Sequence, residues 1–99
     1  MKAKIERFST SKEFGASLGL SDIEMELIRQ KKKLIERLRA VRIKKGVSQA
    51  RLATLVGSKQ PAIARMESGQ ISEVSMDFLL KVSLALQISV TFKSSLKAA

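Results

Sequence analysis

From residue 21 onward, apolar residues recur at intervals of three to four, which predicts a succession of amphipathic helices. The first helix begins at Ser21, which stands where an N-cap belongs, with Glu24 three residues later completing a capping box. The apolar positions of this helix are Ile23, Leu27, Leu34, Leu38 and Val41. Basic residues just before Gly46 favour a helix end near Lys45. The pattern leaves open whether the helix is continuous or breaks at residues 31–33.

Three shorter helices are predicted to follow, because residues typical of helix ends punctuate the next forty positions. Glycines that would close a helix in the left-handed conformation are Gly46, Gly57 and Gly69. Serines in N-cap positions are Ser48, Ser58 and Ser75. The expected core residues of the two middle helices are Leu52, Val56, Ile63 and Met66. The last helix would bury Phe78, Leu79, Val82, Leu86 and, as a candidate, Ala85.

After Gln87 the apolar period changes from helical to two, which predicts a short β-strand. Ile88, Val90 and Phe92 alternate with polar residues. A lone strand leaves its backbone groups unpaired, so we expect these residues to pair with the same strand of another copy or with an edge of a different protein. The expected organisation is a flexible arm at 1–20, a helical domain at 21–87, and a dimerisation strand and tail at 88–99.

Charge is the part of the composition that bears most on function. The chain has 99 residues, with 19 Lys and Arg against 9 Asp and Glu, and a net charge of +10. Such a surplus attracts polyanions: nucleic acid first, then an anionic membrane surface or an acidic partner. Residues 34–69 hold eight basic and two acidic residues, so the surplus is concentrated in the middle of the chain.

The absence of several side chains argues against catalysis. His, Cys, Tyr and Trp are all missing, which removes the commonest general base, the thiol nucleophile and the usual zinc ligands. Composition alone leaves a Ser–Lys dyad open, although no spacing points to one. We therefore expect no enzyme activity, no metal and no cofactor. No apolar run is long enough to span a membrane, and residues 1–15 lack a signal-peptide core, so a cytoplasmic, nucleoid-associated protein is expected.

Residues 48–69 predict two short helices joined by a turn at Gly57, the arrangement of a helix-turn-helix. Ala53, four residues before Gly57, is small enough to let the second helix pack closely on the first. Helix pairs with glycine turns also occur in bundles that bind nothing, but the surrounding basic residues favour DNA binding. In a helix-turn-helix, the start of the second helix enters the major groove.

The residues at that start suit the edges of bases. Lys59 can donate to guanine and Gln60 can pair with adenine, while Pro61 offers an apolar surface to a thymine methyl group. Ala62 permits close approach, and Arg65 lies one turn further on. Gln49 and the N–H groups that open the preceding helix are expected to contact phosphate.

The stretch RIKKGVSQARLATLVGSKQPAIARMESGQ resembles the phage-repressor-like helix-turn-helix proteins of the XRE family. The residues that match the family pattern are Gln49, Leu52, Ala53, Gly57, Lys59, Gln60, Ile63, Arg65, Glu67 and Gly69. The resemblance covers about residues 34–87. It implies an all-α, lambda-repressor-like bundle of four to five helices, with a short C-terminal β-strand paired across a dimer.

The resemblance also implies roles for single residues. Arg42 and Glu67 match a buried ion pair that ties the first helix to the third, and Ser68 matches a phosphate-contacting position. Arg51 departs from the pattern, because many members carry a glutamate there that closes a capping box with Ser48. An arginine opposes the helix dipole, but on the DNA side it would attract phosphate.

The flanks of the motif, which are the helical extension from Ser21 and the ending MDFLLKVSLALQISVTF, resemble the antitoxins of bacterial toxin–antitoxin modules. This implies a homodimeric repressor of its own operon, binding double-stranded operator DNA, whose extensions bind and neutralise a toxin. The alternatives are a free-standing regulator of phage or plasmid type and an RNA-binding or scaffolding domain. The RNA reading is disfavoured because no aromatic residue lies near the basic patch. The run at 31–33 and the arm at 1–20 could contact toxin, DNA or nothing.

Overall fold

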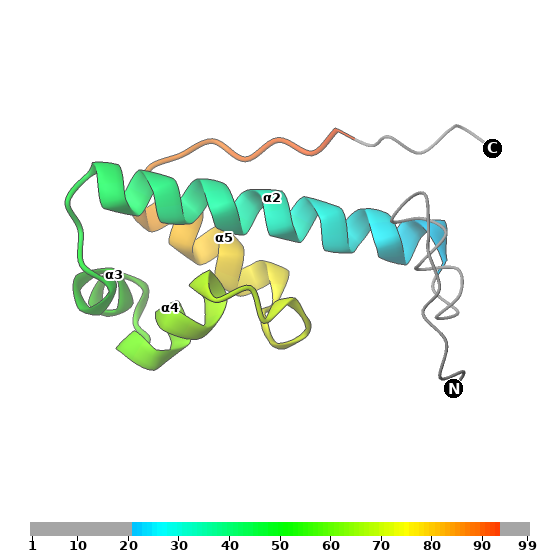
Figure 1. Cartoon of the computed structure of the whole chain (residues 1–99). Helices are drawn as coiled ribbons and strands as arrows, with labels where there is room; N and C mark the ends of the chain where they lie inside the picture. Colours follow the sequence, from blue (N-terminus) through cyan, green and yellow to red (C-terminus); the bar gives the residue numbers. More distant parts are fainter. Residues whose placement is uncertain (1–20, 94–99) are drawn as a thin grey trace, which may run out of the picture.

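A computed structural model of the chain describes residues 21–93 (Figure 1). The expected arm at 1–20 and the tail from residue 94 lie outside this range. The helices are α2 (Asp22–Lys44), α3 (Gln49–Val56), α4 (Gln60–Glu67) and α5 (Met76–Ala85), with the 3-10 turn η1 (Ile71–Glu73) between α4 and α5. Residues 21–93 contain four α-helices and no β-strand, so the predicted helical bundle is confirmed.

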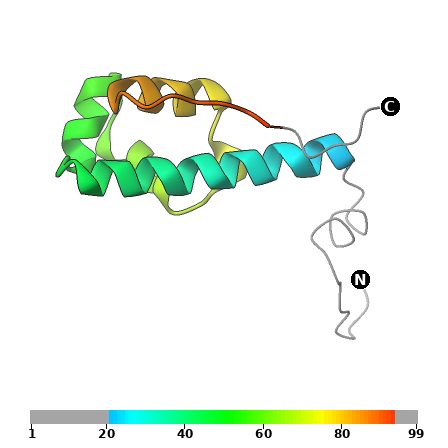
Figure 2. The ribbon, with the colours of Figure 1, turned by 90° about the horizontal axis from the view of Figure 1, so that it is seen from above.

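The first predicted helix is a single, continuous element, α2. The Ser21 hydroxyl accepts a hydrogen bond from the backbone N–H of Glu24, and the Glu24 carboxylate accepts one from the N–H of Ser21, each at 3.0 Å. This reciprocal pair is the expected capping box. The helix runs unbroken through residues 31–33 and ends at Lys44. Figures 1 and 2 show its N-terminal part extending past the other helices.

The projection of α2 corrects one expectation about its apolar face. Leu34 and Leu38 are buried as predicted, but Ile23 and Leu27 are 71% and 48% exposed. The periodicity correctly indicated a helix there. It could not indicate that α4, η1 and α5 leave the apolar residues of the first two turns of α2 exposed.

The core lies where the C-terminal half of α2 meets the three shorter helices. Its buried apolar residues are Leu34, Ile35, Leu38, Leu52, Ala53, Ile63, Met66, Val74, Leu79, Val82 and Leu86. Sequence periodicity did not identify Ile35 and Val74. Ile35 lies beside the main stripe of α2, and Val74 lies in a connection between helices, where periodicity gives no signal.

The turn between α3 and α4 depends on a left-handed glycine. Gly57 has φ +71°, and the N–H of Ser58 donates to the carbonyl of Ala53 at 2.8 Å, closing α3. Ser58 therefore completes the end of α3, and the expectation that it caps α4 is wrong. The N-cap of α4 is Lys59, which makes no side-chain capping bond.

Residues 88–93 are extended and run back along α2, antiparallel to it (Figures 1 and 2). Gln87 makes the turn out of α5 with φ +58°. Arg37 Nη1 donates to the carbonyl of Ser89, and Gln30 Nε2 donates to that of Lys93, both at 2.7 Å. Side chains of α2 thus hold a segment that the sequence predicted as a strand, and its pairing with another strand stays a prediction.

Candidate nucleic-acid interface

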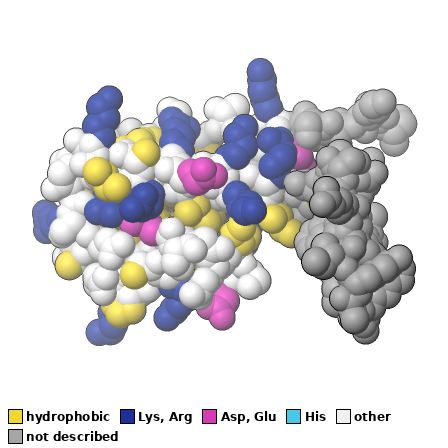
Figure 3. All heavy atoms as spheres, viewed as in Figure 1, with side chains coloured by type: hydrophobic (Ala, Val, Ile, Leu, Met, Phe, Trp, Pro, Cys, Tyr) yellow, Lys and Arg dark blue, Asp and Glu magenta, His cyan; other side chains and the backbone are white. Residues whose placement is uncertain are grey.

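The N-terminal edge of α4 is exposed on the surface of the molecule. Lys59, Gln60 and Pro61 are exposed, and Ala62 is partly exposed behind them. Beside this edge lies an open hollow, whose lining includes Gly57, Ser58 and Arg65. On the face drawn in Figure 3, Lys and Arg side chains lie over α2 and also along the lower edge. The residues expected to read bases are therefore accessible together on one short surface.

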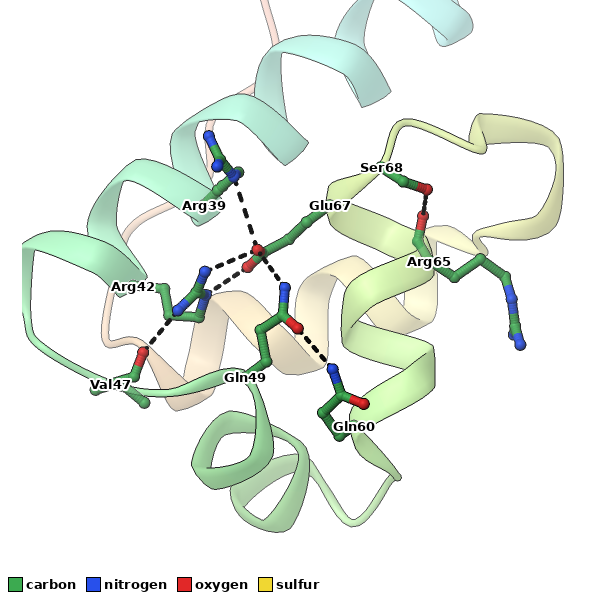
Figure 4. A network of polar contacts seen from close by, with 8 residues as sticks. All are labelled: Arg39, Arg42, Val47, Gln49, Gln60, Arg65, Glu67 and Ser68. Carbon is green, nitrogen blue, oxygen red and sulfur yellow. Dashed lines mark hydrogen bonds and ion pairs between the residues drawn. The ribbon is translucent and has the colours of Figure 1, made fainter.

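A chain of hydrogen bonds connects the N-terminal edge of α4 to the interior (Figure 4). Gln60 Nε2 donates to Gln49 Oε1 at 2.7 Å, and Gln49 Nε2 donates to Glu67 Oε1 at 3.0 Å. The Gln49 side chain bridges the two helices of the motif in this way. Its second amide hydrogen is left for the phosphate contact expected from the sequence.

Glu67 is the inner end of that chain and pairs with Arg42. Arg42 Nε and Nη2 donate to the two carboxylate oxygens of Glu67 at 2.5 and 2.9 Å, which is a bidentate arrangement. Arg42 Nη1 also donates to the carbonyl of Val47 at 2.8 Å. The side chains of Arg42 and Glu67 are only 12% and 4% exposed. The ion pair thus ties α2 to α4 and to the start of α3 at once.

The surroundings of Glu67 hold its carboxyl in the charged form. Burial by itself raises the pKa of Glu67, but hydrogen bonds from Arg42 and Gln49 and the charges of Arg42 and Arg39 outweigh burial. The net effect lowers the pKa of Glu67 below its usual value of about 4.5. Glu67 therefore accepts hydrogen bonds from Arg42 and Gln49 as a carboxylate, with both of its oxygens acting as acceptors.

Because the pKa of Glu67 is lower in the folded protein, the unfolded chain binds a proton first as the solution is acidified. The contribution of ionised Glu67 to the free energy of unfolding is complete above pH about 4.5. It is lost as the pH falls through the lower pKa that Glu67 has in the folded protein. We expect Glu67→Gln to be less stable than wild type at neutral pH, with the difference shrinking below pH about 4. Urea unfolding across this range measures it. A difference that is constant with pH would contradict the assignment.

The other residues predicted to contact DNA lie around the N-terminal edge of α4, and they differ in their hydrogen bonds and ion pairs. Arg51 is exposed in the first turn of α3, and its backbone N–H donates to the Ser48 hydroxyl at 3.0 Å. Arg65 is exposed on α4, with its Nε 3.9 Å from a carboxylate oxygen of Glu73. The Ser68 hydroxyl donates to the carbonyl of Arg65 at 2.8 Å (Figure 4). Ser68 can therefore meet a phosphate only after that local bond is exchanged.

Arg39 is a member of the network that sequence reasoning missed. Its Nε lies 3.8 Å from Glu67 Oε1, and its side chain is 59% exposed. Arg39 lies one helical turn before Arg42, so the i, i+3 spacing of the two arginines was the available signal. It adds positive charge at the surface above the buried pair.

Within residues 21–93 there is no cluster of three or more His, Cys, Asp or Glu side chains that could hold a metal ion. None of the helices in the same range combines the length and the apolar character that crossing a membrane requires.

Residues 38–93, more than half of the chain, match the helix-turn-helix family of proteins. No curated protein and no solved structure gives a significant match.

Proposed function

The chain belongs to the helix-turn-helix family, in its XRE type, and from that premise we propose that it is a homodimeric repressor that reads operator DNA with the N-terminal edge of α4. Family membership identifies a DNA-binding transcription regulator. The observation that carries the finer proposal is the hydrogen-bonded chain from buried Glu67 through Gln49 to Gln60. It holds a base-reading side chain in place before DNA arrives.

The proposed base contacts come from five residues of this edge: Lys59, Gln60, Pro61, Ala62 and Arg65. Gln60 gives one amide hydrogen to Gln49 and keeps its second hydrogen and its oxygen for the N7 and N6 positions of adenine. Holding the amide in one orientation lowers the entropy lost on binding. Lys59 then supplies a donor for guanine in the adjacent position.

The proposed phosphate contacts are Arg51, Gln49 and Ser68, which flank the base-reading edge. Arg51 lies in the first turn of α3, where backbone N–H groups also favour an anion. We expect Arg51→Ala to weaken binding about equally on all sequences and to reduce the slope of log K against log salt by about 1. Fluorescence anisotropy at four salt concentrations measures the slope. An unchanged slope would remove Arg51 from the interface.

The direct test of the repressor proposal is a mobility-shift assay with DNA from upstream of the chain's own gene. We expect a retarded complex that a scrambled duplex of the same composition fails to compete away. A complex competed equally by both duplexes would leave only non-specific binding and would contradict operator recognition.

We further propose that this repressor is the antitoxin of a type II toxin–antitoxin module, acting at the nucleoid and binding a toxin through its extensions. The resemblance of both flanks to such antitoxins and the projection of α2 beyond the DNA-binding core support this proposal. Copurification of a neighbouring gene product that is toxic when expressed alone tests it. Its absence would leave the free-standing regulator of phage or plasmid type.

The homodimer is proposed to form around Ile88, Val90 and Phe92. The carbonyls of Ser89 and Lys93 face α2, so the alternation of an extended chain turns those of Val90 and Phe92 the opposite way. That outer edge can accept a second strand. Sedimentation equilibrium of the wild type is expected to give a dimer. A monomer at micromolar concentration would contradict this part of the proposal.

A further inference from the structure

A second hollow, of about 250 Å³, adjoins the one beside the N-terminal edge of α4. Ser58, Ala62 and Arg65 line both hollows, and the second one extends to Glu73 of η1. Arg65 Nε lies 3.9 Å from Glu73 Oε2, and both side chains are at least half exposed. An accessible carboxylate therefore borders the surface that is proposed to read DNA.

The backbone that carries Glu73 is anchored on both sides. Lys31 Nζ on α2 donates to the carbonyl of Ile71 at 3.0 Å, at the start of η1. After η1, Val74 is buried in the core, and the Ser75 hydroxyl caps α5 by accepting from a backbone N–H. Contacts other than its own ion pair therefore hold the backbone of Glu73 beside α4.

Glu73 has the opposite sign from the side chains that attract DNA. A carboxylate close to the DNA backbone repels phosphate and weakens binding to every sequence. Folding does not explain the ion pair either, because exposed pairs add little to stability. What Glu73 can change is how Arg65 presents its donors. The carboxylate lies against Nε, which leaves the two terminal Nη groups available together.

We propose that Arg65 reads a guanine through Nη1 and Nη2, and that Glu73 is the positioning residue that orients it. Guanine offers two acceptors in the major groove, O6 and N7, and the two Nη groups of an arginine can meet both at once. Arg65 lies one turn beyond Pro61 on the same face of α4. Figure 4 shows its side chain on the opposite side of α4 from that of Glu67.

Glu73 favours the base over the DNA backbone as the partner of Arg65. Its carboxylate narrows the range of positions open to the guanidinium, which lowers the entropy lost on binding. It also repels a phosphate that approaches Arg65, whereas the edge of a guanine carries no net charge. The inference rests on the proposed reading of DNA by α4, and it adds the base that Arg65 reads and the residue that positions it.

Binding to a series of operator duplexes, each changed at one base pair, tests these roles. We expect Arg65→Ala to lose a preference of about tenfold for one G·C pair. Glu73→Gln is expected to reduce the preference at the same pair to about threefold, because Arg65 is then no longer held. Full preference in Glu73→Gln would overturn the inference. Loss at an A·T pair, or at no pair, in Arg65→Ala would overturn it as well.

Asp77→Asn is the matched control, because it removes the same charge from the first turn of α5, and the second hollow is lined by Glu73 and not by Asp77. Glu73→Gln is expected to bind a scrambled duplex about threefold more tightly, with the slope of log K against log salt steeper by about 1, since Arg65 can then contact a phosphate. Asp77→Asn is expected to leave the base preference unchanged. Equal changes of base preference in the two variants would mean that net charge alone acts, which would overturn the role of Glu73.

The double variant Arg65→Ala/Glu73→Gln gives an independent readout. If Glu73 acts through Arg65, the double variant has the same base preference as Arg65→Ala. A further loss of preference at that base pair would mean that Glu73 contacts the base itself, and it would contradict a positioning role. Circular dichroism checks that each variant keeps its helix content.

The same measurements distinguish failure of this inference from failure of the proposed function. A wild type that binds operator and scrambled duplexes equally would overturn both. A wild type that selects its operator, with one base preference lost in Gln60→Ala and none lost in Arg65→Ala, would keep base reading by Gln60. That result would overturn only the roles of Arg65 and Glu73.

Discussion

Arg42→Ala is expected to lower the free energy of unfolding by about 3–5 kcal/mol, the usual cost of breaking a buried ion pair. The substitution leaves the Glu67 carboxylate buried with its strongest partner gone, and it frees the carbonyl of Val47. Small domains are marginally stable, so much of the chain would be unfolded at physiological temperature. Urea denaturation followed by circular dichroism measures the loss.

Arg39→Ala is the matched control for that experiment. It removes an arginine from the same helix and the same carboxylate, but Arg39 is 59% exposed and 3.8 Å away. Exposed pairs contribute about 0–1 kcal/mol, so the expected loss is within that range. Similar losses for the two variants would mean that the contact between Arg42 and Glu67 does not hold α2 to α4.

Gln60→Ala is expected to weaken operator binding by about 1–3 kcal/mol, or about 5- to 150-fold, while non-specific binding changes little. The reason is that the proposed role of the Gln60 amide is to read one base pair, whereas the substitution leaves the positive charge around it unchanged. Titration of labelled operator and scrambled duplexes by fluorescence anisotropy measures both constants.

Gln49→Ala serves as the companion variant, because Gln49 hydrogen-bonds to Gln60 and is not one of the proposed base contacts. It is expected to lose part of the specificity that Gln60→Ala loses. In the ratio of operator to scrambled-duplex affinity, the double variant should be little worse than Gln60→Ala, since the two side chains act on the base through one hydrogen bond at 2.7 Å. Loss of the phosphate contact proposed for Gln49 weakens binding to both duplexes alike. Fully additive losses in that ratio would show that the two glutamines act independently.

Most helix boundaries in this chain could be predicted because they depend on local chemistry. Ser21, Ser48 and Ser75 each cap a helix with their hydroxyl group, as their positions predicted. Ser58 does not, because its backbone N–H closes α3, and the N-cap of α4 is Lys59. Packing between helices decides whether a turn residue ends the preceding helix or caps the following one, and sequence patterns do not contain that information.

Some features of the candidate site could be predicted from the sequence, and others could not. The accessibility of Lys59 and Gln60 follows from their place at the start of α4. The contact of Arg42 with Glu67 spans 25 residues, and only the family resemblance pointed to it. The bond from Gln60 to Gln49 was not predicted at all, because it depends on how closely two helices cross and on the rotamers available there.

The most direct test of base reading by α4 is a parallel selection of binding sites from a pool of random duplexes, using wild type and Gln60→Ala. We expect the wild type to enrich one motif, and the variant to enrich the same motif with the preference lost at a single base pair of each half-site. Enrichment of no motif by the wild type, or of identical motifs by both proteins, would contradict the proposal that the N-terminal edge of α4 reads DNA.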